Sequence, residues 1–374
     1  MAKKILVIHS SGKISGAEKS LMDVLHILKA KYDVTVVLPH KGELYNKLYG
    51  SFIIKIFAVT GIQRKAGFIQ QLKTLYNIFI TSWRIYRFVK KQKTDLIYCN
   101  NTQASIYSIL TSILTNTRHI WHVRDNLPNK TTGAIVGFFS DKIFCISQHI
   151  YKQLSFTKKK ILLYNGINTA NWKSSAVNIN CLKKEMRIAV NTILIGQIGQ
   201  LIPWKNNSLF IEVARQVIAH NNRVHFVLIG RDMFHAYPYY KKSLKEKINQ
   251  ANLQHHFTML DFTDNIMDYM QELDILIHLA QNEPFGRVII EAMALEKPVI
   301  ALNSGGPQEI ISHGRSGYLI DLPDAAIIAE KLNILVNDAA LRKQFGTEGR
   351  KIINEKFNIG NLEKINDIIS SLLH

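Results

Sequence analysis

Two glutamates separated by seven residues stand out in the segment 282–294, NEPFGRVIIEAMA. Glu283 lies in the turn after the apolar run DILIHLA, and Glu291 lies within the helix predicted for RVIIEAMALE. The N-terminus of such a helix offers free backbone N–H groups and the positive end of its dipole, which suit phosphate. Carboxylates are repelled by phosphate but accept strong hydrogen bonds from sugar hydroxyls. The segment therefore predicts a site for a ligand such as a sugar nucleotide.

A plainer interpretation exists for each glutamate alone. Glu283 could cap the helix, and Glu291 could be a solvated residue on its surface. Gly286 favours the binding site for the stretch as a whole, because a glycine allows a ligand to approach the backbone closely. The segment 298–320 follows, and its Gly305, Gly306 and Glu309 are expected to shape a second loop of the same site.

Short apolar strands alternate with helical segments along the whole chain and predict the elements that position these residues. In the first half, KKILVIHS, DVTVVLP, DLIYCNN, RHIWHVRD and DKIFCIS have the composition of buried parallel strands. The alternation restarts at NTILIGQIG after a polar, irregular segment. We therefore predict an α/β protein with two doubly wound, Rossmann-like domains. Their expected ranges are 1–170, a linker at 171–190, and 191–374, with the last helix crossing back to the N-terminal domain.

The cysteines and the apolar runs exclude several classes of protein. The 374 residues include three widely spaced cysteines, Cys99, Cys145 and Cys181, which argue against a disulfide framework or a zinc site and favour a reducing compartment. The N-terminal MAKKILVIHSSG has the pattern of a first strand rather than of a signal peptide. No apolar run is long enough to predict a transmembrane helix.

The net charge of +19 is concentrated in the first half of the chain. Residues 1–170 contain 25 Lys and Arg against 7 Asp and Glu. Surface solubility alone could explain such an excess, but an asymmetry between halves favours an anionic partner, either a membrane surface or a nucleic acid. Because the sequence has no recognised nucleic-acid motif, we expect no nucleic-acid partner.

The sequence motifs, taken in order along the chain, resemble those of the retaining nucleotide-sugar glycosyltransferases of glycosyltransferase family 4. Members of that family have the GT-B fold, in which two domains face each other across a cleft. The most specific match is E-P-F-G-R-x-x-x-E-A-M-A, followed by PVIALNSGGPQEIISHGRSGYLI. Weaker matches in the same order are SGKISGAEKSL, RHIWHVRD, DKIFCIS, LLYNGIN and GQLIPWKN. The resemblance covers nearly the whole chain.

The resemblance implies a donor-binding role for residues of the second domain. Glu283 would bind hydroxyls of the transferred sugar, Glu291 would hold the ribose hydroxyls, and Lys205 would neutralise the departing diphosphate. Gln200 stands where many relatives have an arginine, so one cationic contact with the diphosphate is missing. Backbone N–H groups near the sugar and the diphosphate would come from Phe285, Gly286 and Arg287.

The resemblance also implies roles for residues of the first domain. Gly16 would let the first loop approach the diphosphate, although Ser15 stands where many relatives have a second glycine. His122 would lie near the donor sugar and the reaction centre; a buried structural histidine is the alternative. Its neighbour Arg124 could hold an acceptor phosphate.

The expected reaction needs no metal cofactor. Departure of the diphosphate develops negative charge, which Lys205 and a helix N-terminus can stabilise. Some glycosyltransferases use a divalent metal held by an Asp-x-Asp pair, a motif that this sequence lacks. Retention of the anomeric configuration is implied by the resemblance, and the sequence identifies no residue as a catalytic nucleophile. We therefore expect same-face attack, with the leaving diphosphate as the base.

Residues 71–93 form the best candidate for a membrane-binding helix. Leu72, Leu75, Tyr76, Phe79, Trp83 and Tyr86 fall on one helical face. Packing of that face on the sheet would explain most of the pattern. The accompanying cations exceed what packing requires and are typical of an interfacial helix; they are Lys73, Arg84, Arg87, Lys90, Lys91 and Lys93.

These observations favour a glycosyltransferase of the hexosyltransferase type. It would use a UDP-sugar or GDP-sugar and extend a lipid-linked saccharide during polysaccharide or lipopolysaccharide assembly. We expect it in the cytoplasm, peripherally associated with the inner face of the cytoplasmic membrane. One alternative is a sugar-nucleotide epimerase or hydrolase on the same fold, and another is a non-catalytic nucleotide-sugar or polyanion-binding protein.

Overall fold

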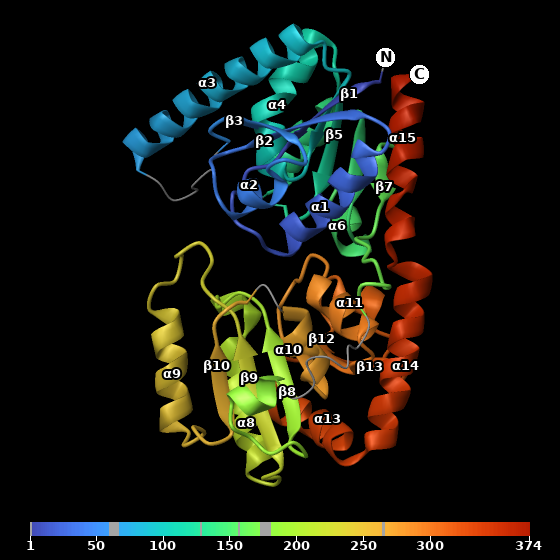
Figure 1. The fold of residues 1–374 in the computed structure, drawn as a ribbon. Coiled ribbons are helices and arrows are strands. Elements are labelled where there is room, and N and C mark those ends of the chain that lie inside the picture. The colour runs from blue at the N-terminus through green and yellow to red at the C-terminus, as the bar shows by residue number, and fades with distance from the viewer. Residues whose placement is uncertain (1, 60–66, 128, 156–157, 173–180, 264–265) are drawn as a thin grey trace. The chain divides into compact units, whose positions relative to one another are not determined.

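The computed structural model describes residues 2–59, 67–127, 129–155, 158–172, 181–263 and 266–374. The chain divides into two compact units (Figure 1). Unit 1 comprises Met1–Gly166 and Ile359–His374, and unit 2 comprises Ile167–Asn358. Each unit is an α/β domain built on a parallel sheet, which confirms the predicted fold class.

Unit 1 contains a parallel sheet with the strand order β3-β2-β1-β4-β5-β6-β7. Its strands are β1 (Lys4–Ile8), β2 (Asp33–Leu38), β3 (Ile53–Ile56), β4 (Leu96–Cys99), β5 (Arg118–Val123), β6 (Lys142–Cys145) and β7 (Lys160–Leu162). The connecting helices are α1 (Gly16–Lys29), α2 (Glu43–Leu48), α3 (Phe68–Gln92), α4 (Thr102–Thr115), α5 (Lys130–Phe139) and α6 (Gln148–Lys152). Leu21 and Leu25 of α1 pack on one face of this sheet, and Ile85 and Val89 of α3 pack on another core cluster.

Unit 2 contains a second parallel sheet with the strand order β10-β9-β8-β11-β12-β13. Its strands are β8 (Ile193–Ile198), β9 (Val224–Ile229), β10 (Phe257–Leu260), β11 (Ile275–His278), β12 (Val299–Leu302) and β13 (Gly317–Ile320). Its helices are α7 (Cys181–Glu185), α8 (Asn207–Ile218), α9 (Tyr240–Gln250), α10 (Ile266–Glu272), α11 (Arg287–Ala294), α12 (Pro307–Ile310), α13 (Ala325–Asn337) and α14 (Ala339–Lys356), with a 3₁₀ turn at Pro203–Lys205.

The direction of chain progression reverses once in each sheet, between β1 and β4 in unit 1 and between β8 and β11 in unit 2. Ligands of doubly wound proteins bind outside the carboxyl ends of the strands at such a switch point. In unit 2, the loop after β8 carries Lys205 and the loop after β11 carries Glu283. The topology therefore brings these two residues to the same edge of the sheet.

The segment expected as a linker, 171–190, belongs to unit 2. Residues 173–180 lie outside the described part of the chain. The backbone amides of Leu182 and Lys183, at the start of α7, donate to the carboxylate of Glu272 at 2.7 and 3.1 Å. Lys183 also donates to the backbone oxygens of Val190 and Thr192. The described part of this segment is thus anchored in unit 2 by capping and side-chain hydrogen bonds that composition does not reveal.

The C-terminal segment Ile359–His374 belongs to unit 1. Its helix α15 (Lys364–Leu373) buries Ile365 and Ile369 in the same core cluster as the apolar face of α1. Tyr32, between α1 and β2, contacts α15 through its hydroxyl, which lies 3.0 Å from Ser370 Oγ. The last helix therefore completes the core of unit 1.

Candidate functional site

The carboxylate of Glu283 is held by a cation and an imidazole. Lys205 Nζ lies 2.6 Å from Glu283 Oε2, and His278 Nε2 lies 3.1 Å from the same oxygen. Glu283 and His278 are both buried. Burial alone would raise the pKa of Glu283, but the charge of Lys205 and the hydrogen bond from His278 outweigh it and hold that pKa well below its usual range. Glu283 is therefore ionised at neutral pH and can accept further hydrogen bonds.

His278 is the residue of this cluster that sequence reasoning missed. It ends β11, and burial lowers its pKa, with a further lowering from the charge of Lys205 that the contact with Glu283 opposes. The neutral imidazole donates its Nε2–H to Glu283. The sequence position of His278 could have indicated this role, because DILIH has its histidine at the carboxyl end of a buried strand, where ligands bind.

The second carboxylate, Glu291, is also buried and paired. Arg287 Nε donates to Glu291 Oε1 at 2.9 Å, one turn apart on α11. The N-cap of this helix is Gly286 at φ 103°, a left-handed conformation that favours glycine. The plainer interpretation is therefore wrong on both counts: Glu291 is not solvated, and Glu283 bonds to Lys205 and His278 instead of capping α11.

Close backbone packing fixes the loop that carries Glu283. The amide of Gly306 donates to the backbone oxygen of Glu283 at 2.7 Å, and Glu283 forms an isolated parallel bridge with Gly305. A Cβ at Gly305 would lie 2.2 Å from the Glu283 oxygen, and one at Gly306 would lie 2.1 Å from the oxygen of Phe285. Phe285 itself is buried, with its ring 5.9 Å from that of Phe357. The glycine pair belongs to the following loop, the second loop that the sequence indicated, and packs closely against the loop that carries Glu283.

The loop after β8 is fixed in the same way. Asn206, which precedes α8 at φ 53°, donates through Nδ2 to the backbone oxygen of Leu279 at 2.9 Å. Gln197 Nε2 donates to the backbone oxygen of Lys205 at 3.1 Å. Lys205 Nζ also lies 4.3 Å from the centroid of the Trp204 ring. Gln200 is half-buried in this loop, and its backbone oxygen accepts from Asn207 at 3.4 Å.

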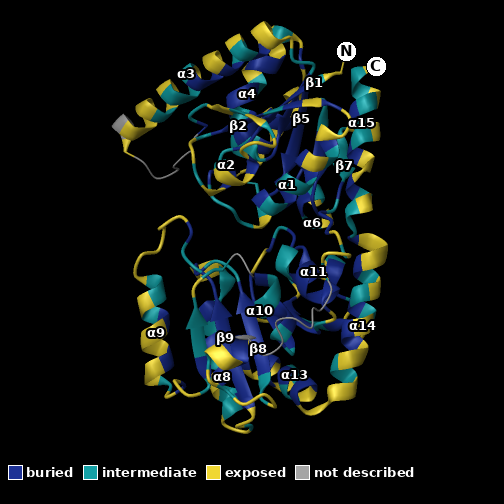
Figure 2. Cartoon of the chain, in the orientation of Figure 1, coloured by how far each residue is buried: buried dark blue, intermediate teal, exposed yellow. Residues whose placement is uncertain are grey.

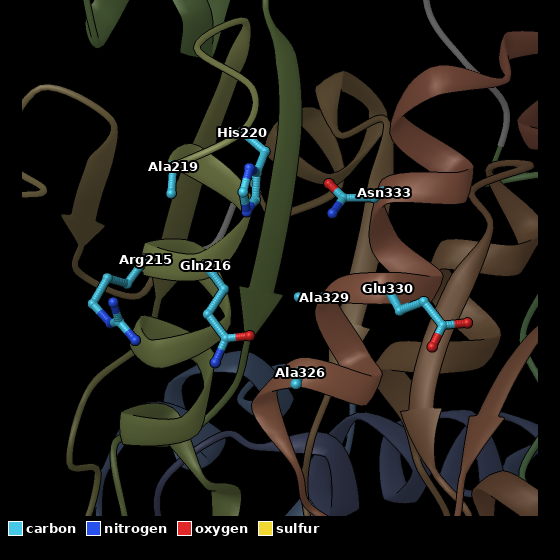
Figure 3. Close-up of a pocket in the computed structure, with 8 residues that line it drawn as sticks. All are labelled: Arg215, Gln216, Ala219, His220, Ala326, Ala329, Glu330 and Asn333. Carbon is cyan, nitrogen blue, oxygen red and sulfur yellow. The ribbon is translucent and has the colours of Figure 1, made fainter.

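A surface groove elsewhere on unit 2 does not include these residues. It lies between α8 and α13 (Figure 3) and is lined by Arg215, Gln216, Ala219, His220, Ala326, Ala329, Glu330 and Asn333. The Lys205–Glu283–His278 cluster lies instead at the switch point of the sheet, where a site is expected.

In unit 1, His122 and Arg124 lie together at the end of β5. Arg124 donates to Asn100 Oδ1 at 2.6 Å, to Asn165 Oδ1 at 2.7 Å, and through Nη2 to His122 Nδ1 at 3.3 Å. Tyr98 Oη also contacts His122 Nδ1. These residues converge on the carboxyl edge of β4 and β5.

His122 is fully buried, with its ring edge-on to those of Tyr98 and Phe144. Burial, followed by the charge of Arg124, lowers the pKa of His122 well below its usual range. The imidazole is therefore neutral, and because its Nδ1 accepts from Arg124 its proton resides on Nε2. Within the described residues, this buried Nε2 has no hydrogen-bond partner. His122 thus carries a donor group that the core of unit 1 leaves unused.

The expected first loop of unit 1 begins α1. Gly16 is the first, exposed residue of this helix, and Ser15 is its N-cap. Glu18 is buried behind them and accepts from His9 Nε2 at 2.6 Å and from the Ser15 amide at 2.8 Å. Burial would raise the pKa of Glu18, but the hydrogen bonds from His9 and Ser15 lower it from 4.5 to about 2.

We predict that Glu18→Gln destabilises the protein in a pH-dependent way. A carboxylate with a depressed folded pKa contributes stability above its unfolded pKa, and that contribution disappears as pH falls through the folded value. The variant should lose about 2–3 kcal/mol of unfolding free energy at pH 7. The difference from the wild type should shrink between pH 4.5 and about 2 in urea titrations followed by circular dichroism. Glu330→Gln, at an exposed position of α13, is the control; a difference independent of pH would contradict the prediction.

Comparisons with known proteins agree with this fold and with these motifs. Residues 179–352 match the family model described as glycosyl transferases group 1. The human alpha-1,3/1,6-mannosyltransferase ALG2 is 32% identical over 287 residues, which cover 73% of this chain and 67% of ALG2. The UDP-Gal:alpha-D-GlcNAc-diphosphoundecaprenol alpha-1,3-galactosyltransferase of Escherichia coli is 21% identical over 397 residues, covering 98% of this chain and 96% of that enzyme. Other curated relatives are matched over less of their length: the chain spans 35%, 56% and 54% of three of them.

The crystal structure of Anabaena HepE in complex with UDP and glucose superposes on the chain with a TM-score of 0.84 and 24% identity, covering 99% of this chain and 100% of HepE. This likeness shows the GT-B fold that the sequence predicted. Together with the match to ALG2, the family model shows that the chain belongs to the group 1 glycosyl transferases.

Proposed function

We propose that the protein transfers a sugar, with retention of configuration, from a nucleotide-sugar donor to a lipid-linked saccharide. The observation that carries this proposal is the pairing of Lys205 with Glu283 at the switch point of unit 2. An ammonium group suits a diphosphate, and an adjacent carboxylate suits sugar hydroxyls. A nucleotide sugar carries both groups side by side.

The charges of the cluster fit a diphosphate leaving group. As the bond between sugar and diphosphate breaks, Lys205 and the N–H groups at the start of α11 stabilise the growing negative charge. Glu283 holds the sugar hydroxyls, with His278 fixing the orientation of its carboxylate. Glu291 accepts from Arg287 through Oε1 and holds the ribose hydroxyls. Lys205 and these N–H groups take the place that a metal ion has in other glycosyltransferases, and the proposed reaction therefore uses no metal.

Retention follows from attack on the face that the diphosphate leaves. The departing diphosphate takes the proton of the acceptor hydroxyl, so no enzyme nucleophile is required. In unit 1, the neutral His122 carries a free Nε2–H donor, and the exposed Gly16 leaves the start of α1 open. Arg124 contributes positive charge toward an acceptor phosphate.

The relatives support a choice of donor and acceptor. HepE was crystallised with UDP and glucose, and the E. coli relative is named for UDP-Gal and a diphosphoundecaprenol-linked sugar. We therefore propose a UDP-sugar as the donor and a saccharide on a lipid diphosphate as the acceptor. We propose that the enzyme works on such an acceptor at the inner face of the cytoplasmic membrane, in the assembly of a cell-surface polysaccharide or lipopolysaccharide.

A panel of UDP-, GDP- and ADP-sugars tests the donor by thermal shift. A ligand present at 100 times its Kd stabilises the folded state by about 2.7 kcal/mol. We expect the largest rise in Tm with one UDP-sugar, a smaller rise with UDP alone, and none with the ADP-sugars. The absence of a shift with every donor would contradict the proposal.

Product analysis separates the proposal from its alternatives. With the preferred donor, release of UDP should require a saccharide-diphosphate-lipid acceptor, and the anomeric configuration of the donor should be kept in the product. Equal release of UDP without the acceptor would indicate a hydrolase, and recovery of an isomerised donor would indicate an epimerase. Donor binding without any turnover would indicate a binding protein.

A further inference from the structure

The helix α3 exposes several of its large apolar residues. Five of them lie along one helical face and are 50–69% exposed: Leu72, Leu75, Tyr76, Phe79 and Trp83. We call these five residues the α3 stripe. Figure 2 shows exposed residues along the length of this helix. Monomeric soluble proteins rarely expose a large contiguous apolar surface without a function.

The opposite face of α3 packs against the rest of unit 1 through Ile85 and Val89 and through small or polar residues. Thr81 and Ser82 are buried, and Ser82 Oγ donates to the backbone oxygen of Tyr107 on α4 at 2.8 Å. Asn77 Nδ2 donates to the hydroxyl of Tyr107 at 3.1 Å. The alternative, in which this apolar face packs on the sheet, is therefore wrong: Leu75 and Phe79 are exposed, while hydrogen-bonding residues face α4.

The cations of α3 accompany the stripe. Residues 68–92 include no acidic side chain, and exposed basic residues occupy both halves of the helix: Lys73, Arg84, Arg87, Lys90 and Lys91. The rings of Trp83 and Tyr86 are stacked at 5.2 Å, and Lys90 Nζ lies 5.8 Å from the centroid of Tyr86. Aromatic rings next to ammonium and guanidinium groups are the composition of helices that lie in the headgroup region of a bilayer.

The neighbouring helices expose apolar residues as well. The helix α4 packs against both α3 and α5. Leu110, Ile113 and Leu114 of α4 are exposed, as are Ile135, Phe138 and Phe139 of α5. Lys159 donates to the backbone oxygen of Phe138 at 2.5 Å and adds a cation beside this group. The apolar and basic character therefore extends beyond α3.

We propose that α3 binds the surface of an anionic bilayer, with the stripe against the acyl boundary and the cations at the headgroups. Charge complementarity selects this occupant: a second copy of the chain would bring an equally basic, acid-free α3, whereas anionic lipids match both the charge and the apolar stripe. None of the helices in the described ranges combines the length and apolarity needed to span a bilayer. This inference concerns the surface of unit 1 and does not depend on the proposed transfer reaction.

Vesicle flotation tests the proposal with the full chain. Vesicles of phosphatidylcholine alone are compared with vesicles that also contain roughly 30 mol% of the anionic lipid phosphatidylglycerol. We expect binding to the anionic vesicles only. Arg84→Gln/Arg87→Gln/Lys91→Gln should weaken binding by about five-fold for each cation removed and reduce its dependence on salt. Leu75→Ser/Phe79→Ser should weaken it at least ten-fold at every salt concentration.

Two controls keep the experiment decisive. Leu322→Ser changes an equally exposed leucine of unit 2 and should leave vesicle binding intact. A blue shift of tryptophan fluorescence on anionic vesicles should disappear in Trp83→Phe if the stripe enters the bilayer. Equal binding to neutral vesicles, unchanged binding of the Leu75/Phe79 variant, or a dimer in solution that this variant dissociates would each overturn the proposal. The donor-induced Tm shift should persist in all α3 variants, so a failure of donor binding would count against the proposed function alone.

Discussion

Lys205→Met should reduce kcat/KM for sugar transfer by about 10²–10³-fold, the typical effect of removing one group that stabilises a developing negative charge. The ammonium group is the cation closest to Glu283, at 2.6 Å, and it is proposed to neutralise the leaving diphosphate. Its loss should therefore weaken the binding of UDP itself as well as of the UDP-sugar. Transfer kinetics and calorimetric titration with UDP measure the two effects.

The same substitution should destabilise unit 2, because it leaves a buried carboxylate without its cation. Burial would then raise the pKa of Glu283 from its present low value. A raised folded pKa lowers stability most at neutral pH, so the deficit of the variant should decrease as the medium is acidified toward the pKa of a free glutamate. The double variant Lys205→Met/Glu283→Gln removes the unpaired charge and should regain stability without regaining activity.

Lys331→Met is the matched control, since Lys331 pairs with Glu330 on α13 at the surface of unit 2. It should change neither UDP binding nor transfer. If Lys205→Met kept the wild-type affinity for UDP, the ion pair with Glu283 would be structural and the diphosphate would have to bind elsewhere.

The alternation of strands and helices predicted both domains, because near-continuous apolar strands such as VHFVLI are buried whatever the details of packing. The Glu283–Glu291 spacing likewise predicted a turn and a helix with a carboxylate in each. The ion pair between Lys205 and Glu283 could not be predicted. It joins loops that follow different strands, and only the strand order brings Lys205 next to Glu283.

The orientation of α3 shows a second limit of sequence patterns. An apolar stripe at helical spacing has the same periodicity whether it packs on a sheet or faces outward. Which face of α3 is buried depends on its contacts with the neighbouring helix α4. Here Ser82 and Asn77 form hydrogen bonds with Tyr107 of α4. The signal in the sequence was the excess of cations around Trp83 and Tyr86, which a buried face does not need.

Glu283→Gln should reduce transfer by at least about 10²-fold while leaving UDP affinity unchanged or somewhat increased. The amide keeps the shape of the carboxylate and can still accept from His278 Nε2, but it loses the charge that strengthens hydrogen bonds from sugar hydroxyls. Removal of the carboxylate also frees the charge of Lys205 for the diphosphate. The opposite responses of UDP affinity in Glu283→Gln and Lys205→Met would assign the sugar to one residue and the diphosphate to the other.

His278→Asn tests the residue that contacts the carboxylate of Glu283. The shorter side chain removes the contact at 3.1 Å that orients Glu283. It should therefore raise KM for the UDP-sugar more than the Kd for UDP. Glu212→Gln, which breaks an exposed pair with Arg215 on α8, should behave as the wild type. Equal losses of UDP affinity in Glu283→Gln and Lys205→Met would instead show that the Lys205–Glu283 pair acts as one structural unit. In that case Lys205 would not bind the diphosphate, nor Glu283 the sugar, independently of its partner.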